Sequence, residues 1–212
     1  MVKQNNKKGG LAGKQGLFII YFRFLHSIIN DLLRRYHYVF ISAINERYAD
    51  AFCRRVSELA VKLAVLCGEP VVNQTKISVV AIYHDIGKIK LPEEILNKKE
   101  PLTDEEYNLI KQHTNFGSVL MKGYCSDDIC QMIQYHHENI DGSGYYRLTE
   151  IPLGSRIIRI CDVYDAMTSI RPYHTGKSID ETMNYIRSHA GILFDESLVQ
   201  LFSIIIQRKK EI

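Results

Sequence analysis

Residues Ile77 to Lys88 read ISVVAIYHDIGK, an apolar run that ends in a histidine, an aspartate and a lysine. The run from Ile77 to Tyr83 alone fits either a strand or a buried helix, because a short apolar run has no clear period. Asn73 precedes it and is a residue type that caps helices. We therefore predict a helix that begins at Asn73 and ends at His84 and Asp85.

The segment before this run is more clearly helical. Over residues 46–67, apolar side chains recur at three- and four-residue steps, and Gly68 and Pro70 then end the helix. The later segments show neither alternating strands nor repeats, so the predicted fold class is all-α. Further helices are expected from Thr103 (a capping box with Glu106) toward His113, over residues 127–138, from Pro152 to Ser169, from Ser178 (a capped start with Glu181), and over residues 195–206.

The N-terminal 45 residues differ from the rest in composition. Residues 1–16 are polar, glycine-rich and basic, which predicts a disordered tail. Residues 17–45 are predicted to form a helical extension, which begins LFIIYFRFLHSII. Arg23 and His26 interrupt this run, which is too short to span a bilayer and lacks the cleavage site of a signal peptide. We expect it to pack on the domain or on a partner, with a helix at the membrane surface as the alternative.

The overall composition excludes several classes of protein. Apolar residues make up 46% and charged residues 24%, as in an ordinary globular domain. The net charge of +3 fits an anionic small substrate but does not single out nucleic acid, so we expect no DNA partner. The five cysteines contain no C-x-x-C pair, and their odd number argues against a disulfide framework. Free thiols in a reducing, cytoplasmic location are the expectation.

The adjacent His84 and Asp85 could bind one metal ion together. The carboxylate has two oxygens, so it could bridge to a second ion, and Lys88 lies three residues on, where it could reach a phosphate. The pair alone is a weak signal, because a buried histidine with a satisfied hydrogen bond gives the same pattern. Imidazole and carboxylate ligands suit Fe, Mn, Ni or Zn better than Ca or Mg. More candidate ligands lie in later short segments, namely His113, His136, His137 and Asp162.

The order of these segments resembles the bacterial HD-GYP family, a branch of the HD phosphohydrolase superfamily. An ordered set is far more specific than any single motif. The resemblance implies an HD-domain helical bundle over residues 46–212 with an additional N-terminal helix. It also implies a phosphodiesterase that hydrolyses cyclic di-GMP to pGpG or GMP. The matching segments are HDIGK, ILNKKEPLTDEEYNLIKQHTNFG, HHENIDGSGYY, IPLGSRIIRICDVYDAMTSIRPY and FDESLV.

The resemblance further implies a dinuclear site that holds two divalent transition-metal ions, Fe or Mn in the first place and Ni or Zn as alternatives. Asp85 would bridge the ions, and Lys88 would contact the scissile phosphate. Tyr145 and Arg171 would help Lys88 to hold the dinucleotide. The implied partners are cyclic di-GMP and either a second copy of the chain or a sensor or diguanylate-cyclase-type protein. The implied metal ligands are His84, Asp85, His113, His136, His137 and Asp162.

The chain departs from the family in its first domain helix. Phe52 stands where the family usually places another histidine ligand, and members with a third metal have a glutamate at the position of Tyr48. Asp50 and Cys53 are nearby but out of register on a helix. The set around His84 is therefore expected to lack a ligand. Weakening even an outer partner of a metal typically costs about 10–100-fold in affinity or activity, so this loss should cost at least as much.

Two positions near the substrate also differ. Tyr146 replaces the proline of Gly-Tyr-Pro, and His174 replaces a basic residue after Arg-Pro-Tyr. Three hypotheses remain open: an active cyclic di-GMP phosphodiesterase, a degenerate member that binds the nucleotide or a signalling partner without hydrolysis, and an HD hydrolase for another nucleotide. The GSGY loop disfavours the third. We expect low or absent activity on cyclic di-GMP.

Overall fold

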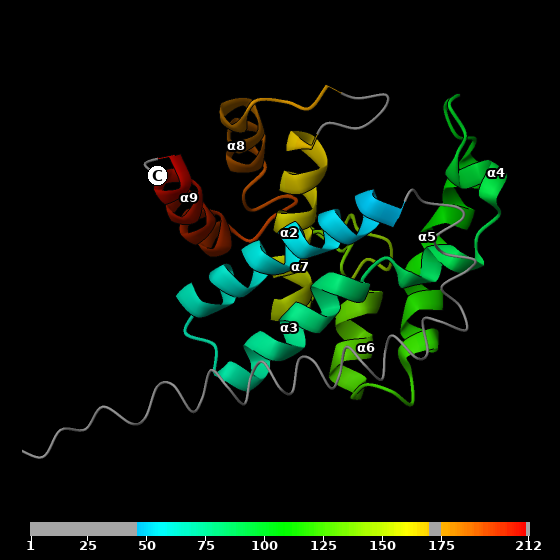
Figure 1. Ribbon diagram of the computed structural model, residues 1–212, viewed down its shortest axis with the longest axis horizontal. Coiled ribbons are helices and arrows are strands. Elements are labelled where there is room, and N and C mark those ends of the chain that lie inside the picture. Colours follow the sequence, from blue (N-terminus) through cyan, green and yellow to red (C-terminus); the bar gives the residue numbers. More distant parts are fainter. Residues whose placement is uncertain (1–45, 170–174, 211–212) are drawn as a thin grey trace, which may run out of the picture. The chain divides into compact units, whose positions relative to one another are not determined.

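The computed structural model describes residues 46–169 and 175–210. In this part the chain forms only helices, without a strand, and thus confirms the all-α prediction (Figure 1). The predicted tail over residues 1–16 and the helix over residues 17–45 lie outside the described residues. In chain order the elements are α2 (Glu46–Leu66), α3 (Val71–Tyr83), the 3-10 helix η1 (Ile86–Lys90), α4 (Glu93–Leu96), α5 (Asp104–Met121), α6 (Asp127–Gln134), α7 (Leu153–Thr168), α8 (Ile179–Ser188) and α9 (Glu196–Lys210).

Two helices begin at the capping boxes that the sequence predicts. The Thr103 hydroxyl accepts a hydrogen bond from the backbone N–H of Glu106, whose carboxylate accepts one from the backbone N–H of Thr103. Ser178 and Glu181 exchange the same pair of bonds at the start of α8. These contacts satisfy N–H groups that the first helical turn leaves without partners. Local sequence therefore determines where α5 and α8 begin.

Two predicted helix boundaries are wrong, one at the start of a helix and one at the end. Asn73 does not cap α3, which begins at Val71 directly after Pro70. Asn73 lies inside the first turn, and its amide donates to the Glu69 carboxylate at 2.6 Å. Helix α6 ends at Gln134 and not at residue 138, because Tyr135 leaves helical geometry at φ −107° and ψ 14°. The residues that follow α6 therefore form a turn.

Helix α7 is the central helix of the described bundle. It contacts α3, α6, α8 and α9, and in Figure 1 it lies behind α2. Four of its side chains are each 0% exposed, namely Ile157, Ile158, Ile160 and Cys161. A helix that is apolar on several sides must be surrounded by other elements. Within the described part of the chain, no helix has the length and apolarity needed to cross a membrane.

Glycine brings η1 close to α5. A Cβ atom added to Gly87 would lie 1.9 Å from the backbone oxygen of His113, so only glycine fits without a shift. Helix α5 also packs side by side with α6. On α2, the Arg55 guanidinium donates two hydrogen bonds to the Asp165 carboxylate of α7, at 2.6 and 2.9 Å. These contacts bring the ends of α3 and α6, the middle of α5 and one side of α7 toward a common interior region.

Candidate functional site

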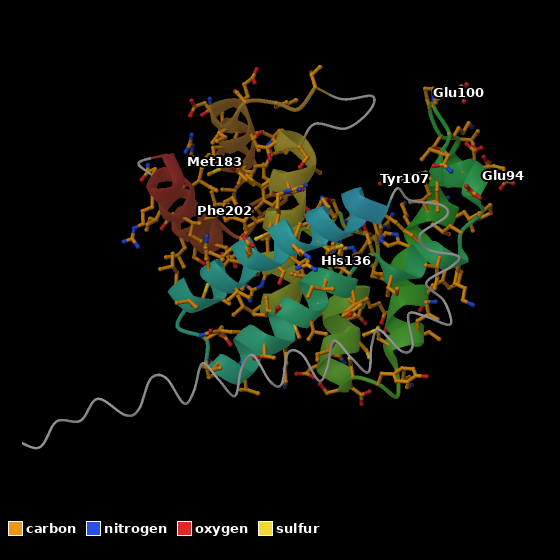
Figure 2. The ribbon with its side chains drawn as sticks, in the orientation of Figure 1. Glu94, Glu100, Tyr107, His136, Met183 and Phe202 are labelled. Carbon is orange, nitrogen blue, oxygen red and sulfur yellow. The ribbon has the colours of Figure 1, made fainter. Side chains whose placement is uncertain are left out.

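Four predicted ligands converge in this interior region. One ligand atom from each lies within 4.8 Å of the others, and the four residues are Asp85, His113, His136 and His137. Asp85 is the N-cap of η1, His113 lies on α5, and both remaining histidines lie in the turn after α6. Figure 2 shows His136 among the helices, in agreement with its 0% exposure. Residues from three separate segments thus form one cluster.

Three histidines are oriented by the backbone in the same way. In each, Nδ1 lies within hydrogen-bond distance of the carbonyl oxygen three residues earlier in the chain. A carbonyl can only accept, so Nδ1 carries the hydrogen, and the neutral form of such a ring has its lone pair on Nε2. This is how metal-binding histidines are commonly oriented. The pairs are His84 with Ala81 at 2.9 Å, His113 with Ile110 at 2.7 Å, and His136 with Ile133 at 2.6 Å.

The Asp85 carboxylate directs its two oxygens to different neighbours. Its Oδ1 lies 3.2 Å from Nε2 of His113, and its Oδ2 lies 3.5 Å from Nε2 of His84 and 2.6 Å from Nζ of Lys88. Burial alone would raise the pKa of Asp85. The positive charge of the Lys88 ammonium opposes this effect, and that pKa lies well below its usual range. Asp85 is thus an anion between two groups of candidate ligands.

The cluster fits a divalent metal ion. Nε2 of His84 and Oδ1 of Asp85 are buried and have no hydrogen-bond partner among the described residues. Nε2 of His113 and Nε2 of His136 lie 3.5 Å apart, with both Nδ1 hydrogens committed to carbonyls. Burial lowers the pKa of His136 well below the usual value, so its ring is neutral, as a ligand must be. Lone pairs that face each other without a hydrogen between them suit a cation.

A second set of candidate ligands lies at the other oxygen of Asp85. Nε2 of His84 is 3.8 Å from Oδ1 of Asp162 on α7. Burial raises the pKa of Asp162, and the nearby charge of Asp85 raises it further. The ring of Phe52 lies 5.9 Å from the ring of His84. This set therefore offers fewer donors than the first, next to an apolar ring and with Lys88 on the shared carboxylate.

Two of the predicted substrate-binding residues lie next to the cluster. Lys88 contacts Asp85, and the ring of Tyr145 lies 4.8 Å from the ring of His137. Burial raises the pKa of Tyr145, so its hydroxyl keeps its proton. Arg171 and His174 lie outside the described residues.

Several polar residues next to the cluster were not among the predicted ligands or substrate contacts. Glu138 is 2% exposed and accepts hydrogen bonds from the loop that follows it. Arg159 donates to Oδ1 of Asn139 at 3.1 and 3.2 Å and lies 3.4 Å from Nδ1 of His137. The Tyr146 hydroxyl is 2.9 Å from the hydroxyl of Thr114. Only their position beside the histidine pair could have suggested a role.

The sequence pattern of the HD domain family matches residues 38–198 of the chain. The chain belongs to the HD domain family. Among curated proteins, this HD domain is 36% identical over 162 residues to 3'3'-cGAMP-specific phosphodiesterase 1 of Vibrio cholerae, a match that covers 74% of the chain and 37% of that protein. It is 38% identical over 154 residues to the cyclic di-GMP phosphodiesterase of Thermotoga maritima, covering 70% of the chain and 42% of that protein. These relatives confirm the resemblance to the HD-GYP branch.

The HD domain thus spans less than half the length of these two relatives. Solved structures share its fold at low identity. A cyclic GMP-AMP specific phosphodiesterase from Vibrio cholerae gives a TM-score of 0.60 at 16% identity, over 74% of the chain and 44% of that protein. The HD domain of the Listeria monocytogenes phosphodiesterase PgpH, in complex with cyclic-di-AMP, gives 0.54 at 19% identity, over 73% and 85%. These similarities concern the fold.

Proposed function

We propose that this HD domain is a metal-dependent phosphodiesterase that hydrolyses a cyclic dinucleotide, with cyclic di-GMP as the first candidate. The observation that carries the proposal is the group of ligand atoms from Asp85, His113, His136 and His137 within 4.8 Å, with the Lys88 ammonium 2.6 Å from Asp85. The names of the relatives, which are phosphodiesterases for cyclic di-GMP or cyclic GMP-AMP, support the same substrate class.

The reaction adds water across one phosphodiester bond of the ring. The water oxygen bonds to phosphorus, and the bond from phosphorus to the ribose 3′-oxygen breaks. That oxygen leaves with a proton, which gives linear pGpG, and a second hydrolysis gives two molecules of GMP. Bound divalent ions supply Lewis-acid stabilisation of the charge on the phosphoryl oxygens and make water more acidic.

The side chains of this chain would orient the reactants. Asp85, with an oxygen toward each ligand set, would serve both ions. Lys88 carries its positive charge at the same carboxylate and would pair with an oxygen of the scissile phosphate. Tyr145 offers a half-buried aromatic face beside His137, against which a nucleotide can stack. Arg171 would add a second cation for the dinucleotide.

Two metal ions of unequal affinity are part of the proposal. His113, His136 and His137 would hold the tighter ion together with Asp85. His84 and Asp162 would hold the weaker one, because Phe52 provides no ligand there. Fe or Mn are the first candidates, followed by Ni or Zn, since imidazole and carboxylate donors suit them.

The second candidate function is a binding module that recognises cyclic di-GMP or a signalling partner without hydrolysis. The observation that favours it is the contact between Phe52 and His84, because a partly filled second site would reduce turnover and leave nucleotide binding intact. Calorimetric titration of cyclic di-GMP, combined with a product assay, separates the two functions.

The test is hydrolysis of cyclic di-GMP, 3'3'-cGAMP and cyclic di-AMP by the purified chain after loading with Mn²⁺ or Fe²⁺, with products separated by chromatography. We expect pGpG or GMP from at least one substrate. Lys88→Met should abolish the activity, whereas Lys90→Met should retain it, because Lys90 is an exposed lysine of the same helix η1. A metal-loaded protein that binds none of the three nucleotides and cleaves none would refute both the phosphodiesterase and the nucleotide-binding module.

A further inference from the structure

Glu138 is a buried acid without a part in the metal cluster. Its side chain is 2% exposed, and it follows the histidine pair directly in the chain. Its Oε1 accepts a hydrogen bond from the backbone N–H of Tyr146 at 2.7 Å, and its Oε2 accepts one from the backbone N–H of Leu148 at 2.9 Å. A buried carboxyl group that accepts two backbone hydrogen bonds is held firmly and holds the donors in return.

The loop that supplies these donors folds back onto Glu138. A Cβ atom added to Gly144 would lie 2.6 Å from Cα of Glu138 and 2.8 Å from the backbone nitrogen of Asn139. Arg147 adopts a left-handed φ of 58°, which costs energy for a residue other than glycine. The bonds to Glu138 lie on both sides of this strained residue. They offset the strain and define the path of residues 144–148.

Tyr145 lies in the part of the loop that Glu138 holds. It directly precedes Tyr146, which donates to Glu138, and its ring lies 4.8 Å from the ring of His137 and 6.5 Å from that of His113. Glu138 itself directly follows His137 in the chain. One side chain therefore connects the loop that presents Tyr145 to the turn that presents the histidines.

The departure at Tyr146 gives Glu138 its second donor. Proline, which the HD-GYP family has at this position, has no N–H group and fixes its own φ angle. Tyr146 instead donates its N–H to Glu138, and its hydroxyl lies 2.9 Å from that of Thr114 on α5. Hydrogen bonds from both the backbone and the side chain thus anchor residue 146, where a proline would have neither donor.

We infer that Glu138 is a positioning residue, which sets the distance between Tyr145 and the histidine cluster and so the affinity for the nucleotide. The inference rests on the proposed function, since Tyr145 matters there as a substrate contact. Glu138 acts through the backbone of the loop and touches neither substrate nor metal.

The absence of tryptophan from the chain allows a direct test. Tyr145→Trp introduces a single fluorescent reporter in the loop, which is read without any nucleotide. Glu138→Gln keeps the shape of the side chain but replaces one acceptor by an NH₂ group, which then faces a backbone N–H. In the metal-loaded protein we expect acrylamide to quench this tryptophan about twofold more strongly after Glu138→Gln, because a buried donor left without its acceptor detaches the loop.

Substitutions of Tyr146, combined with Glu138→Gln, test the inference even if Glu138→Gln lowers stability. In Tyr146→Pro the N–H of residue 146 is absent, so glutamine at position 138 can accept from Leu148 without a clash between donors. The effect of Glu138→Gln on quenching should then largely disappear. Tyr146→Phe is the matched control: it removes only the hydroxyl next to Thr114, and the full effect of Glu138→Gln should remain. Equal effects in the proline and tyrosine backgrounds, or none in either, would overturn the inference.

Kinetics give the link to the substrate. With Tyr145 in place, Glu138→Gln should raise KM for cyclic di-GMP about tenfold, which corresponds to roughly 1.4 kcal/mol, with a smaller change in kcat and the same metal content. Loss of metal in step with activity would contradict a positioning role. If quenching responds as expected while even the unmodified chain cleaves no cyclic dinucleotide, the loop anchor stands and the proposed function fails.

Discussion

The ring of Phe52 lies 5.9 Å from the imidazole of His84, centre to centre, with their planes tilted by 48°. An apolar ring thus packs against a predicted metal ligand, near the position where the family usually has another histidine. We predict that Phe52→His raises metal occupancy and phosphodiesterase activity together, because the weaker ligand set gains a donor. The expected gain is about 10–100-fold in metal affinity at that set, measured by titration with Mn²⁺.

Phe52→Gln is the control for this change, since it introduces a polar side chain without an imidazole and should leave occupancy low. If the unmodified chain already turns over cyclic di-GMP at rates typical of the family and Phe52→His changes nothing, the missing ligand lies elsewhere. Asp50 and Cys53 are then the residues to examine.

Substitution of the clustered ligands should remove metal in a graded way. His136→Ala or His137→Ala should release most of one ion, because each takes a donor from the set that lies within 4.8 Å. Asp85→Asn should release both ions, because the two oxygens of Asp85 face different ligand sets. Elemental analysis after reconstitution with Fe²⁺ or Mn²⁺ measures the outcome.

The control is His189→Ala, which changes a histidine at the end of α8 and should retain the metal. An unmodified protein that takes up none of Fe, Mn, Ni or Zn contradicts the metal site itself.

Asp195 should make stability depend on pH at acid values. Burial would raise its pKa. The hydrogen bonds from Ser197 and Leu198 and the ion pair with Arg156 outweigh this effect, so the pKa is lowered. A lowered pKa adds stability that is complete above the unfolded value of about 3.9 and is lost as the pH falls through the folded value. Asp195→Ala should therefore cost about 1–2 kcal/mol near pH 7, as lost helix caps do.

Urea denaturation at several pH values measures this difference. It should shrink once the pH falls below about 4, because the carboxyl group of the unfolded chain then binds a proton while the folded one is still ionised. Glu196→Ala changes the neighbouring acid in the first turn of α9 and should show a much smaller dependence. A penalty for Asp195→Ala that is constant with pH would mean that its charge contributes nothing.

Sequence predicted the parts of the fold that local chemistry determines. Thr103 and Ser178 start α5 and α8 because their own neighbours complete the capping boxes. The end of α6 at Gln134 depended instead on the turn that brings the histidines inward, which local spacing does not indicate. Asn73 failed as a cap because Pro70 already allows the helix to begin at Val71.

The residues at the candidate site also fall into two groups, those that local sequence reveals and those that only the folded structure brings together. The motif residues that carry imidazole and carboxylate groups could be found by order and type, and the structure brings Asp85 together with His113, His136 and His137. Glu138 could not be predicted as a neighbour of the site, because its hydrogen bonds come from backbone donors eight and ten residues further along a folded loop. Partners of this kind exist only once tertiary structure places them.

Arg159 is a second residue whose contact with the site depends on tertiary structure. Its Nη1 lies 3.4 Å from Nδ1 of His137. A guanidinium can only donate, so neutral His137 accepts at Nδ1, whereas the other three site histidines donate there to carbonyls. A metal ion on Nε2 of His137 would require a hydrogen on Nδ1, opposite the Arg159 donor. The positive charge of Arg159 would also repel the ion.

Arg159→Met should therefore raise the affinity for Mn²⁺ by about tenfold, within the range of outer-partner effects, as measured by competition with a chromophoric chelator. Arg208→Met removes an exposed positive charge from α9 and should change nothing. Weaker binding in Arg159→Met would instead mean that Arg159, through Asn139, holds His137 in place for the metal.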